Sequence, residues 1–118
     1  MKRIFLDDER DPPDDGNEWI VVRSWAEFKA VLSMDDVLAD FISFDHDLGN
    51  PYNMDNPKTG FDCAKYLVQM AMSKTSRRYC PLPDSFQWTV HSENPVGRDN
   101  INGLLKSYFE FKERMDNE

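Results

Sequence analysis

Short apolar runs separated by polar segments are the first pattern along the chain. Four of these runs have the length of buried strands, and each is followed by polar or acidic residues. In the last run, Phe86, Trp88 and Val90 alternate with polar residues, which predicts a strand at a sheet edge with one face less buried. The predicted strands cover residues 4–6, 19–23, 41–44 and 86–90.

Apolar residues at helical spacing predict a helix after each of the last three strands. Ser24 and Glu27 have the spacing of a capping box, in which each side chain bonds a free backbone amide. A second helix opens near Thr59 in the same way, and Asn94 followed by Pro95 is a strong start for a third. The residues predicted to face the core are Trp25, Phe28, Val31 and Leu32, then Phe61, Ala64, Leu67, Val68 and Ala71, and finally Ile101, Leu104, Leu105 and Tyr108.

Strands that alternate with helices indicate an α/β fold with a short, mostly parallel sheet. With 118 residues the chain has the size of one domain, so we expect a single domain over residues 1–118. The link between the first two strands contains two prolines and a glycine and has no helical pattern. Its length is only about the dozen residues that a parallel crossover requires. Either this link is an irregular crossover, or the first two strands are not parallel.

The chain is acidic, with 22 Asp and Glu residues against 14 Lys and Arg residues and a net charge of −8. This balance disfavours a broad nucleic-acid binding face, although a nucleic-acid end remains compatible with it. The apolar runs are too short to cross a membrane and no signal peptide is evident, so we expect a soluble, cytoplasmic protein. Cys63 and Cys80 are isolated and should be buried small hydrophobes, while the basic segment 74–78 should lie at the amino edge of the sheet.

Titratable side chains follow three of the four predicted strands. Because the carboxyl ends of parallel strands meet at one edge of a sheet, we expect these side chains to gather there. The two acidic clusters can share an ion if the first and third strands are neighbours, which gives the strand order 2-1-3-4. The residues are Asp7, Asp8 and Glu9 after the first strand, Asp45, His46 and Asp47 after the third, and His91 with Ser92 after the fourth.

Carboxylates held close together repel one another unless some are protonated or a cation lies among them. Carboxylate oxygens suit Mg²⁺ or Mn²⁺, and an imidazole ligand would favour Mn²⁺ or a softer metal. Taken singly, an acidic turn or a lone histidine usually has only a structural role, but their coincidence at one edge favours a functional site. The helix that starts at Asn94 points its free amides at this edge, with Arg10 and Arg98 close in sequence, which suits a phosphoryl group.

Four motifs of the chain, in order, resemble a known family: FLDDERDP, ISFDHDLG, TGFD and HSENPVG. They are similar to the receiver domains of two-component signalling and, more closely and over nearly the whole chain, to the small receiver-like family described as cyclic-phosphate processing. The resemblance implies a trimmed receiver-like, flavodoxin-like fold with three layers and a metal-dependent site. It implies that Asp7 and Asp8 match the metal-binding acidic pair, that Asp45 matches the phospho-acceptor aspartate, and that Ser92 matches the hydroxyl that senses a phosphoryl group.

The family is proposed to process 2′,3′-cyclic phosphate ends left by RNA cleavage, in repair or conflict settings that include phages. We therefore expect a metal-dependent phosphoesterase that acts on the cyclic phosphate of a nucleotide or an RNA terminus, with Mg²⁺ or Mn²⁺ as cofactor. An attack by Asp45 itself is a variant of this mechanism. The expected roles are metal binding for Asp7, Asp8 and Asp45, acid–base catalysis for His46 or His91 with orientation by Asp47, and phosphate binding for Arg10, Asn94 and Arg98.

Two other functions are compatible with the same residues. One is a non-catalytic receiver-like module that binds a phosphate or a partner protein, and the other is a phage accessory protein that acts on a host factor through its acidic surface. The lysine that contacts the phosphoryl group in receivers lies on a fifth strand, which is not predicted here, so aspartyl-phosphate relay is not expected. His46 and His91 have no counterpart in ordinary receivers. The loop over residues 49–58 should overhang the site as a lid.

Overall fold

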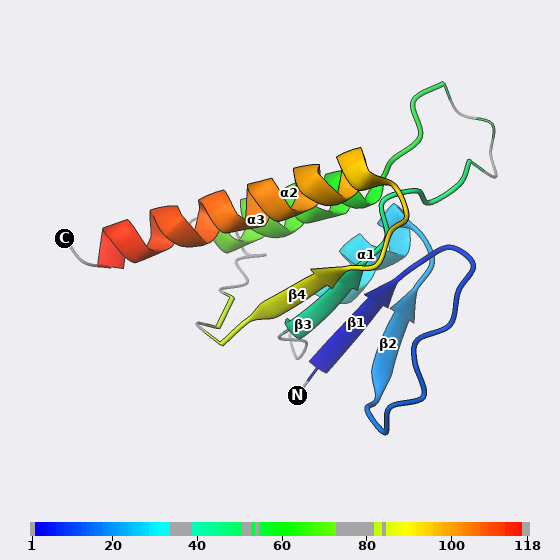
Figure 1. The fold of residues 1–118 in the computed structure, drawn as a ribbon, viewed down its shortest axis with the longest axis horizontal. Helices are drawn as coiled ribbons and strands as arrows, with labels where there is room; N and C mark the ends of the chain where they lie inside the picture. The colour runs from blue at the N-terminus through cyan, green and yellow to red at the C-terminus, as the bar shows by residue number, and fades with distance from the viewer. Residues whose placement is uncertain are drawn as a thin grey trace.

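A parallel sheet of four strands, in the order β2-β1-β3-β4, is the framework of the fold (Figure 1). The computed structural model describes residues 2–33, 39–50, 53, 55–72, 82–83 and 85–116. The strands are β1 (Lys2–Leu6), β2 (Trp19–Val22), β3 (Ala39–Phe44) and β4 (Gln87–Val90). The helices are α1 (Trp25–Leu32), α2 (Gly60–Met72) and α3 (Pro95–Asp116).

The three strand pairs are all parallel, which confirms the α/β class and the predicted strand order. The link between β1 and β2 is therefore an irregular crossover, one of the two alternatives that the sequence left open. Arg23, directly after β2, fastens this link. Its guanidinium donates to the carbonyl oxygens of Asp7, at 3.2 Å, and of Arg10, and it pairs with the carboxylate of Asp11 at 2.7 Å. These contacts order a segment that has no helix of its own.

At each of the three predicted helix starts, a side chain accepts a hydrogen bond from a backbone amide. The Ser24 hydroxyl accepts a hydrogen bond from the amide of Glu27 at 3.1 Å. The Asp62 carboxylate accepts one from the amide of Thr59 at 2.8 Å, and the Asn94 side-chain oxygen accepts one from the amide of Gly97 at 3.0 Å. Each bond satisfies a backbone amide that the first turn of a helix leaves free, so local sequence fixes where the helices begin.

One hydrophobic core lies between the helices and one face of the sheet. Successive strand residues point to opposite faces, and Ile4, Leu6, Val22, Ile42 and Phe44, which have even numbers, are all buried in this core. Residues from all three helices belong to the same core, so these helices cover the same face of the sheet (Figure 1). The helical members include Phe28 and Leu32 of α1, Cys63, Ala64 and Leu67 of α2, and Ile101 and Leu105 of α3.

The other face of the sheet, formed by the odd-numbered strand residues from residue 3 onward, is called the open face below. No helix within the described residues packs on it, so sheet and helices form two layers and not the three that the family resemblance implied. The physical reason is the link between β1 and β2. A right-handed crossover in this direction would place its helix on the open face, and this link has no helix.

Other expectations from the sequence have mixed outcomes. β4 lies at the sheet edge with alternating exposure, as predicted. Cys63 is fully buried, and this burial raises the pKa of its thiol far above the usual range. Cys80, the segment 74–78 and part of the loop 49–58 lie outside the described residues.

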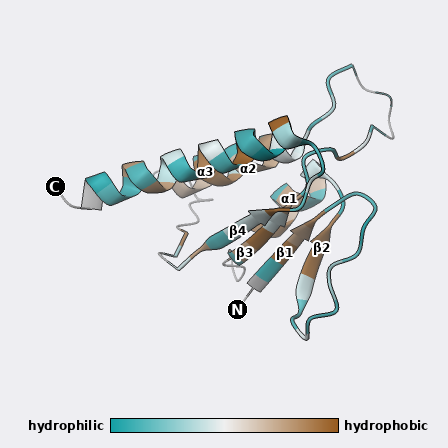
Figure 2. Ribbon diagram, in the orientation of Figure 1, coloured by the Kyte–Doolittle hydropathy of each residue, from teal (hydrophilic) through white to brown (hydrophobic). Residues whose placement is uncertain are grey.

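Hydrophilic residues dominate the link between β1 and β2 (Figure 2). Within the described part of the chain, no helix is both long and apolar enough to cross a membrane.

Gly60, the first residue of α2, allows this helix to approach the backbone of Asp45 and His46, directly after β3. A Cβ atom at this position would lie 1.8 Å from the carbonyl oxygen of Asp45, whereas a Cβ at Gly103 of α3 meets nothing within 4 Å. Gly60→Ala should therefore destabilise the protein by about 1–3 kcal/mol, because backbone must move to admit the methyl group. Gly103→Ala should instead stabilise it by roughly 0.5–1 kcal/mol. Denaturant unfolding measures both, and equal effects of the two substitutions would contradict the close packing at Asp45.

Candidate metal centre

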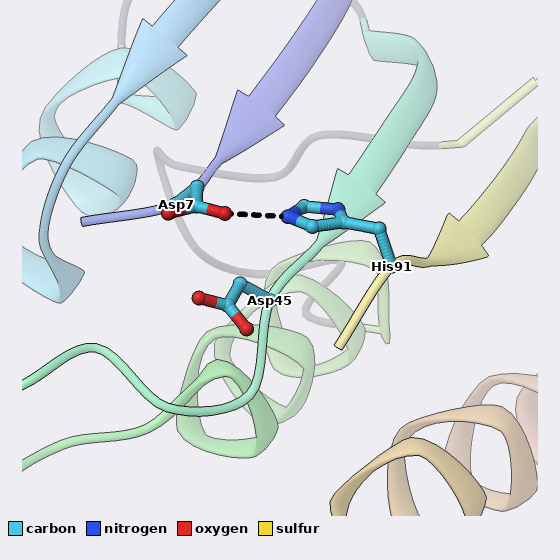
Figure 3. A group of neighbouring side chains, drawn as sticks. All are labelled: Asp7, Asp45 and His91. Atoms are coloured by element: carbon cyan, nitrogen blue, oxygen red, sulfur yellow. Dashed lines mark hydrogen bonds and ion pairs between the residues drawn. The ribbon is translucent and has the colours of Figure 1, made fainter. Parts of the chain in front are cut away.

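The candidate site lies at the carboxyl edge of the sheet, one residue beyond β1, β3 and β4. The amides of Asp7, Asp45 and His91 continue the strand ladders by bonding the carbonyls of Val22, Leu6 and Phe44, at 3.1, 3.0 and 2.9 Å. The three residues, all with odd numbers, lie together at this edge (Figure 3). Each offers one ligand atom, and these atoms lie within 4.8 Å of one another. The predicted gathering of side chains from three separate strands is therefore present.

Asp7 is the most buried of the three, with only 2 % of its surface exposed. One carboxylate oxygen, Oδ1, accepts hydrogen bonds from the amides of Glu9 and Arg10 at 2.9 and 2.8 Å. The other, Oδ2, lies 2.9 Å from Nε2 of His91. Burial by itself raises the pKa of Asp7, but the two amides and His91 together outweigh it and lower the pKa below its ordinary value. Asp7 is thus a fixed negative charge at neutral pH.

His91 is held on three sides. Its Nε2 faces Asp7, its Nδ1 lies 2.7 Å from the hydroxyl of Ser43, and its ring stacks on Phe5 with centroids 4.6 Å apart and planes 8° from parallel. Because ionised Asp7 can only accept, Nε2 carries the proton, and in the neutral ring Nδ1 then accepts from the Ser43 hydroxyl. Ser43 was not identified by sequence reasoning. Its position two residues before Asp45 on the same strand face was the available signal.

The pKa of Asp45 is shifted in the direction opposite to that of Asp7. Its pKa is raised, first by burial and then by the negative charge of Asp7, with a smaller contribution from Asp8, while His91 acts against the shift. Two carboxylates and an imidazole are a donor set that divalent metal ions accept, and a cation among them would relieve the repulsion. The residues therefore fit a divalent ion. Nε2 of His91 can either ligate such an ion or donate to Asp7, but not both.

Asp8, predicted to complete the acidic pair, does not belong to the group formed by Asp7, Asp45 and His91. It lies beside the start of the loop that follows β3. Gly49 has a φ of +69°, and a Cβ there would be 2.9 Å from a carboxylate oxygen of Asp8. Asp8 therefore acts on Asp45 through its charge and borders the loop expected to be a lid.

His46 belongs to a second group at the same edge. Its Nδ1 lies 2.9 Å from the carboxylate of Asp47 and 3.4 Å from the side-chain nitrogen of Asn94. The His46 ring packs against the first turn of α3 at Gly97. A Cβ at that position would lie 2.3 Å from the ring, so glycine leaves the space that the ring occupies. Asp47 thus contacts His46, whereas His91 contacts Ser43 and Asp7.

The remaining predicted residues surround the start of α3. Ser92 is buried, and its hydroxyl accepts a hydrogen bond from the amide of Asn94 at 3.1 Å, so it shapes the turn before the helix. Arg10 pairs with Glu93 at 3.3 Å, and both side chains are more than half exposed, which makes this a weak pair. Arg98 lies in the first turn of α3 with an exposed side chain.

The raised pKa of Asp45 predicts how stability depends on pH without metal. Folded Asp45 holds its proton above the ordinary pKa of 3.8, so its ionisation costs stability as pH rises through and beyond that value. Asp45→Asn should therefore be more stable than the unmodified protein at pH 7 in EDTA, and the difference should vanish below about pH 3.8.

Asp62 provides a control of opposite sign. Burial alone raises its pKa, but the amide of Thr59 and then Lys65 outweigh this and lower it. Asp62→Asn should therefore lose stability at pH 7, and this loss should fade as pH falls through 3.8. Thermal melts of both variants across pH measure the two slopes. A loss of stability in Asp45→Asn at pH 7 would show that Asp45 is already compensated within the protein.

Comparison with known proteins accords with this geometry. No curated protein and no solved structure gives a significant match. A family model described as "Cyclic-phosphate processing Receiver domain" matches residues 2–107, a span that contains every strand, the Asp7, Asp45 and His91 group and the start of α3. This match covers well over half of the chain. The protein therefore belongs to the family of cyclic-phosphate processing receiver domains.

Proposed function

We propose that the protein is a metal-dependent phosphoesterase that opens or removes the 2′,3′-cyclic phosphate of a nucleotide or an RNA terminus. The observation that carries the proposal is the group of Asp7, Asp45 and His91, whose ligand atoms lie within 4.8 Å of one another in a chain of this family. A cyclic phosphate as substrate follows from the family's description, and hydrolysis is the step that we add.

Asp7 and Asp45 are the residues that would hold the ion, and the charge of Asp8 adds to its attraction. When bound, the ion supplies positive charge to the phosphoryl oxygens and favours ionisation of a water molecule. Asp7 is suited to this role because its lowered pKa keeps it ionised. Asp45 is suited because the raised pKa reflects a charge that lacks compensation in the protein alone.

In the reaction, a water molecule that has lost a proton to solvent forms a bond to phosphorus through its oxygen, and the bond from phosphorus to one ribose oxygen breaks. The ribose oxygen leaves with the bonding electron pair and takes a proton from a histidine, which gives a phosphate monoester. His91 carries a proton on Nε2 at the site itself, held by Asp7 and Ser43. If His91 instead ligates the ion, His46, oriented by Asp47, is the acid that remains.

The start of α3 is the part of the site that is suited to bind the phosphate. The first-turn amides of a long helix favour an anion, and Asn94, Arg10 and Arg98 lie at or near this end. The exposed pair between Arg10 and Glu93 is weak enough for a phosphate to displace the carboxylate. Ser92 supports this end of the helix through the amide of Asn94.

A second function is favoured by one specific observation. Both ring nitrogens of His91 already have partners, and Asp7 is bonded through both oxygens, so the network is closed without substrate. Such a closed network suits a receiver-like module that binds a phosphate or a partner protein without turnover. Measured turnover of a cyclic phosphate would separate the two functions.

Metal binding is the first test. Mg²⁺ or Mn²⁺ should raise the melting temperature, because an ion that binds only the folded state stabilises it in proportion to its occupancy. The rise should be much smaller for Asp45→Asn and unchanged for Glu113→Gln, which removes an exposed carboxylate from the far end of α3. Differential scanning fluorimetry with an ion titration measures this. Equal shifts in all three proteins would locate the metal elsewhere.

Turnover is the second test. The purified protein with Mn²⁺ or Mg²⁺ should convert a mononucleotide 2′,3′-cyclic phosphate to a monoester, and linear diesters should react far more slowly because they lack ring strain. His91→Ala and Asp45→Asn should each lower kcat/KM by roughly 10²- to 10⁴-fold. His46→Ala distinguishes the two acids: a comparable loss assigns the proton to His46, and a small loss assigns it to His91. The absence of product with metal demonstrably bound would favour the binding module.

A further inference from the structure

The open face of the sheet leads directly into the candidate metal centre. Strand register arranges its side chains in three rows across the sheet, each two residues further along every strand. Row 1 contains Trp19, Arg3, Phe41 and Gln87. Row 2 contains Val21, Phe5, Ser43 and Thr89. Row 3 continues the ladder beyond the strand ends as Arg23, Asp7, Asp45 and His91.

Row 1 carries a partly exposed aromatic pair. The rings of Trp19 and Phe41 meet edge to face with centroids 5.9 Å apart, over a strand that separates them. The guanidinium of Arg3 lies over both rings, 5.6 Å from the centroid of Trp19 and 5.2 Å from that of Phe41. All three side chains keep contact with solvent, since no helix of the described residues covers this face. Partly exposed aromatic surface and a cation thus lie together in row 1.

An aromatic path connects row 1 to the site. The Phe5 ring contacts Trp19 edge to face at 5.8 Å and stacks on His91 at 4.6 Å. Phe5 is only 5 % exposed although no helix among the described residues covers it, because the rings of Trp19 and His91 pack against it. Beside this path, Gln87 and Thr89 of the edge strand are exposed and offer polar groups. The open face is therefore continuous with the metal centre and combines aromatic, cationic and hydrogen-bonding groups.

We propose that the open face binds the nucleotides that precede a 3′-terminal cyclic phosphate, so that the substrate is the end of a single-stranded RNA and not a free nucleotide. This proposal rests on the proposed function and deepens it. Aromatic rings on an open sheet stack with unpaired bases, whatever their sequence. Arg3 supplies the cation for a backbone phosphate, and Gln87 and Thr89 supply hydrogen bonds.

The spacing of the rows indicates how many nucleotides take part. Row 1 is four strand residues from row 3, or about 13 Å along the strand. This is further than a terminal nucleoside reaches from its own phosphate, so the terminal base lies over row 2 and a preceding base reaches Trp19 and Phe41. The net charge of −8 provides no long-range attraction for RNA, and binding therefore depends on these local contacts.

The proposal is tested by binding in EDTA, where metal-dependent turnover cannot consume the RNA. A fluorescently labelled hexaribonucleotide with a 2′,3′-cyclic phosphate end should bind more tightly than the matching mononucleotide, as measured by anisotropy and competition. Trp19→Ala and Phe41→Ala should each weaken hexanucleotide binding by roughly 5- to 100-fold, the range measured for loss of one stacked base. The mononucleotide, which does not reach row 1, should lose far less.

Two further variants guard against a folding defect, a third tests the role of Arg3, and a fourth provides a control. Gln87→Glu and Thr89→Glu add a negative charge at exposed positions of the open face without removing a packed ring, and both should weaken hexanucleotide binding. Arg3→Gln should reduce the salt dependence of hexanucleotide binding. Phe111→Ala removes an aromatic side chain that is 44 % exposed on α3 and should change nothing.

The outcomes are separable from those of the proposed function. Absence of turnover with Mn²⁺ would overturn the phosphoesterase assignment but leave the binding differences in EDTA as support for the open face. Equal affinity for hexanucleotide and mononucleotide, or an effect of Phe111→Ala as large as that of Trp19→Ala, would overturn the RNA proposal. It would also be overturned if the open-face variants changed only the oligomeric state measured by sedimentation, because the face would then pair with a second copy of the chain.

Discussion

The repulsion between the carboxylates of Asp7 and Asp45 is the constraint around which the site is arranged. Adjacent parallel strands bring the two groups to one edge, and the backbone bonds that extend the ladder prevent them from moving apart. The protein itself stabilises one of the two charges, because two amides and His91 lower the pKa of Asp7. The ionised form of Asp45 remains unfavourable, and the pKa of this group is raised. A cation is the simplest external means of balancing it.

Much of this arrangement follows from the sequence by simple rules. Short apolar runs locate the strands, the capping residues Ser24 and Asn94 locate helix starts, and the need for two acidic clusters to meet gives the strand order. The third layer was expected from the family resemblance, and the described residues do not form one. The link between β1 and β2, with two prolines and no apolar stripe, cannot form the helix that would build it.

Long-range side-chain contacts were beyond the reach of sequence reasoning. Ser43 lies in the apolar run between Ile42 and Phe44, and its partner His91 is 48 positions away. Alternation places Ser43 on the face of Asp45, but only the conformation of the His91 ring, turned back onto Phe5, brings the two together. Arg23 was missed for the same reason, since its partners belong to an irregular link whose path no pattern specifies.

The missing helix also has a thermodynamic consequence for the domain as a whole. A sheet covered on both faces buries two apolar layers, whereas the described residues of this protein form one core on one face. A ligand that covers the open face would take the place of the absent layer, so ligand binding would also stabilise the folded protein. The lifetime of such a protein in a cell would then depend on the supply of its ligand, with the unliganded form turned over more rapidly by proteases.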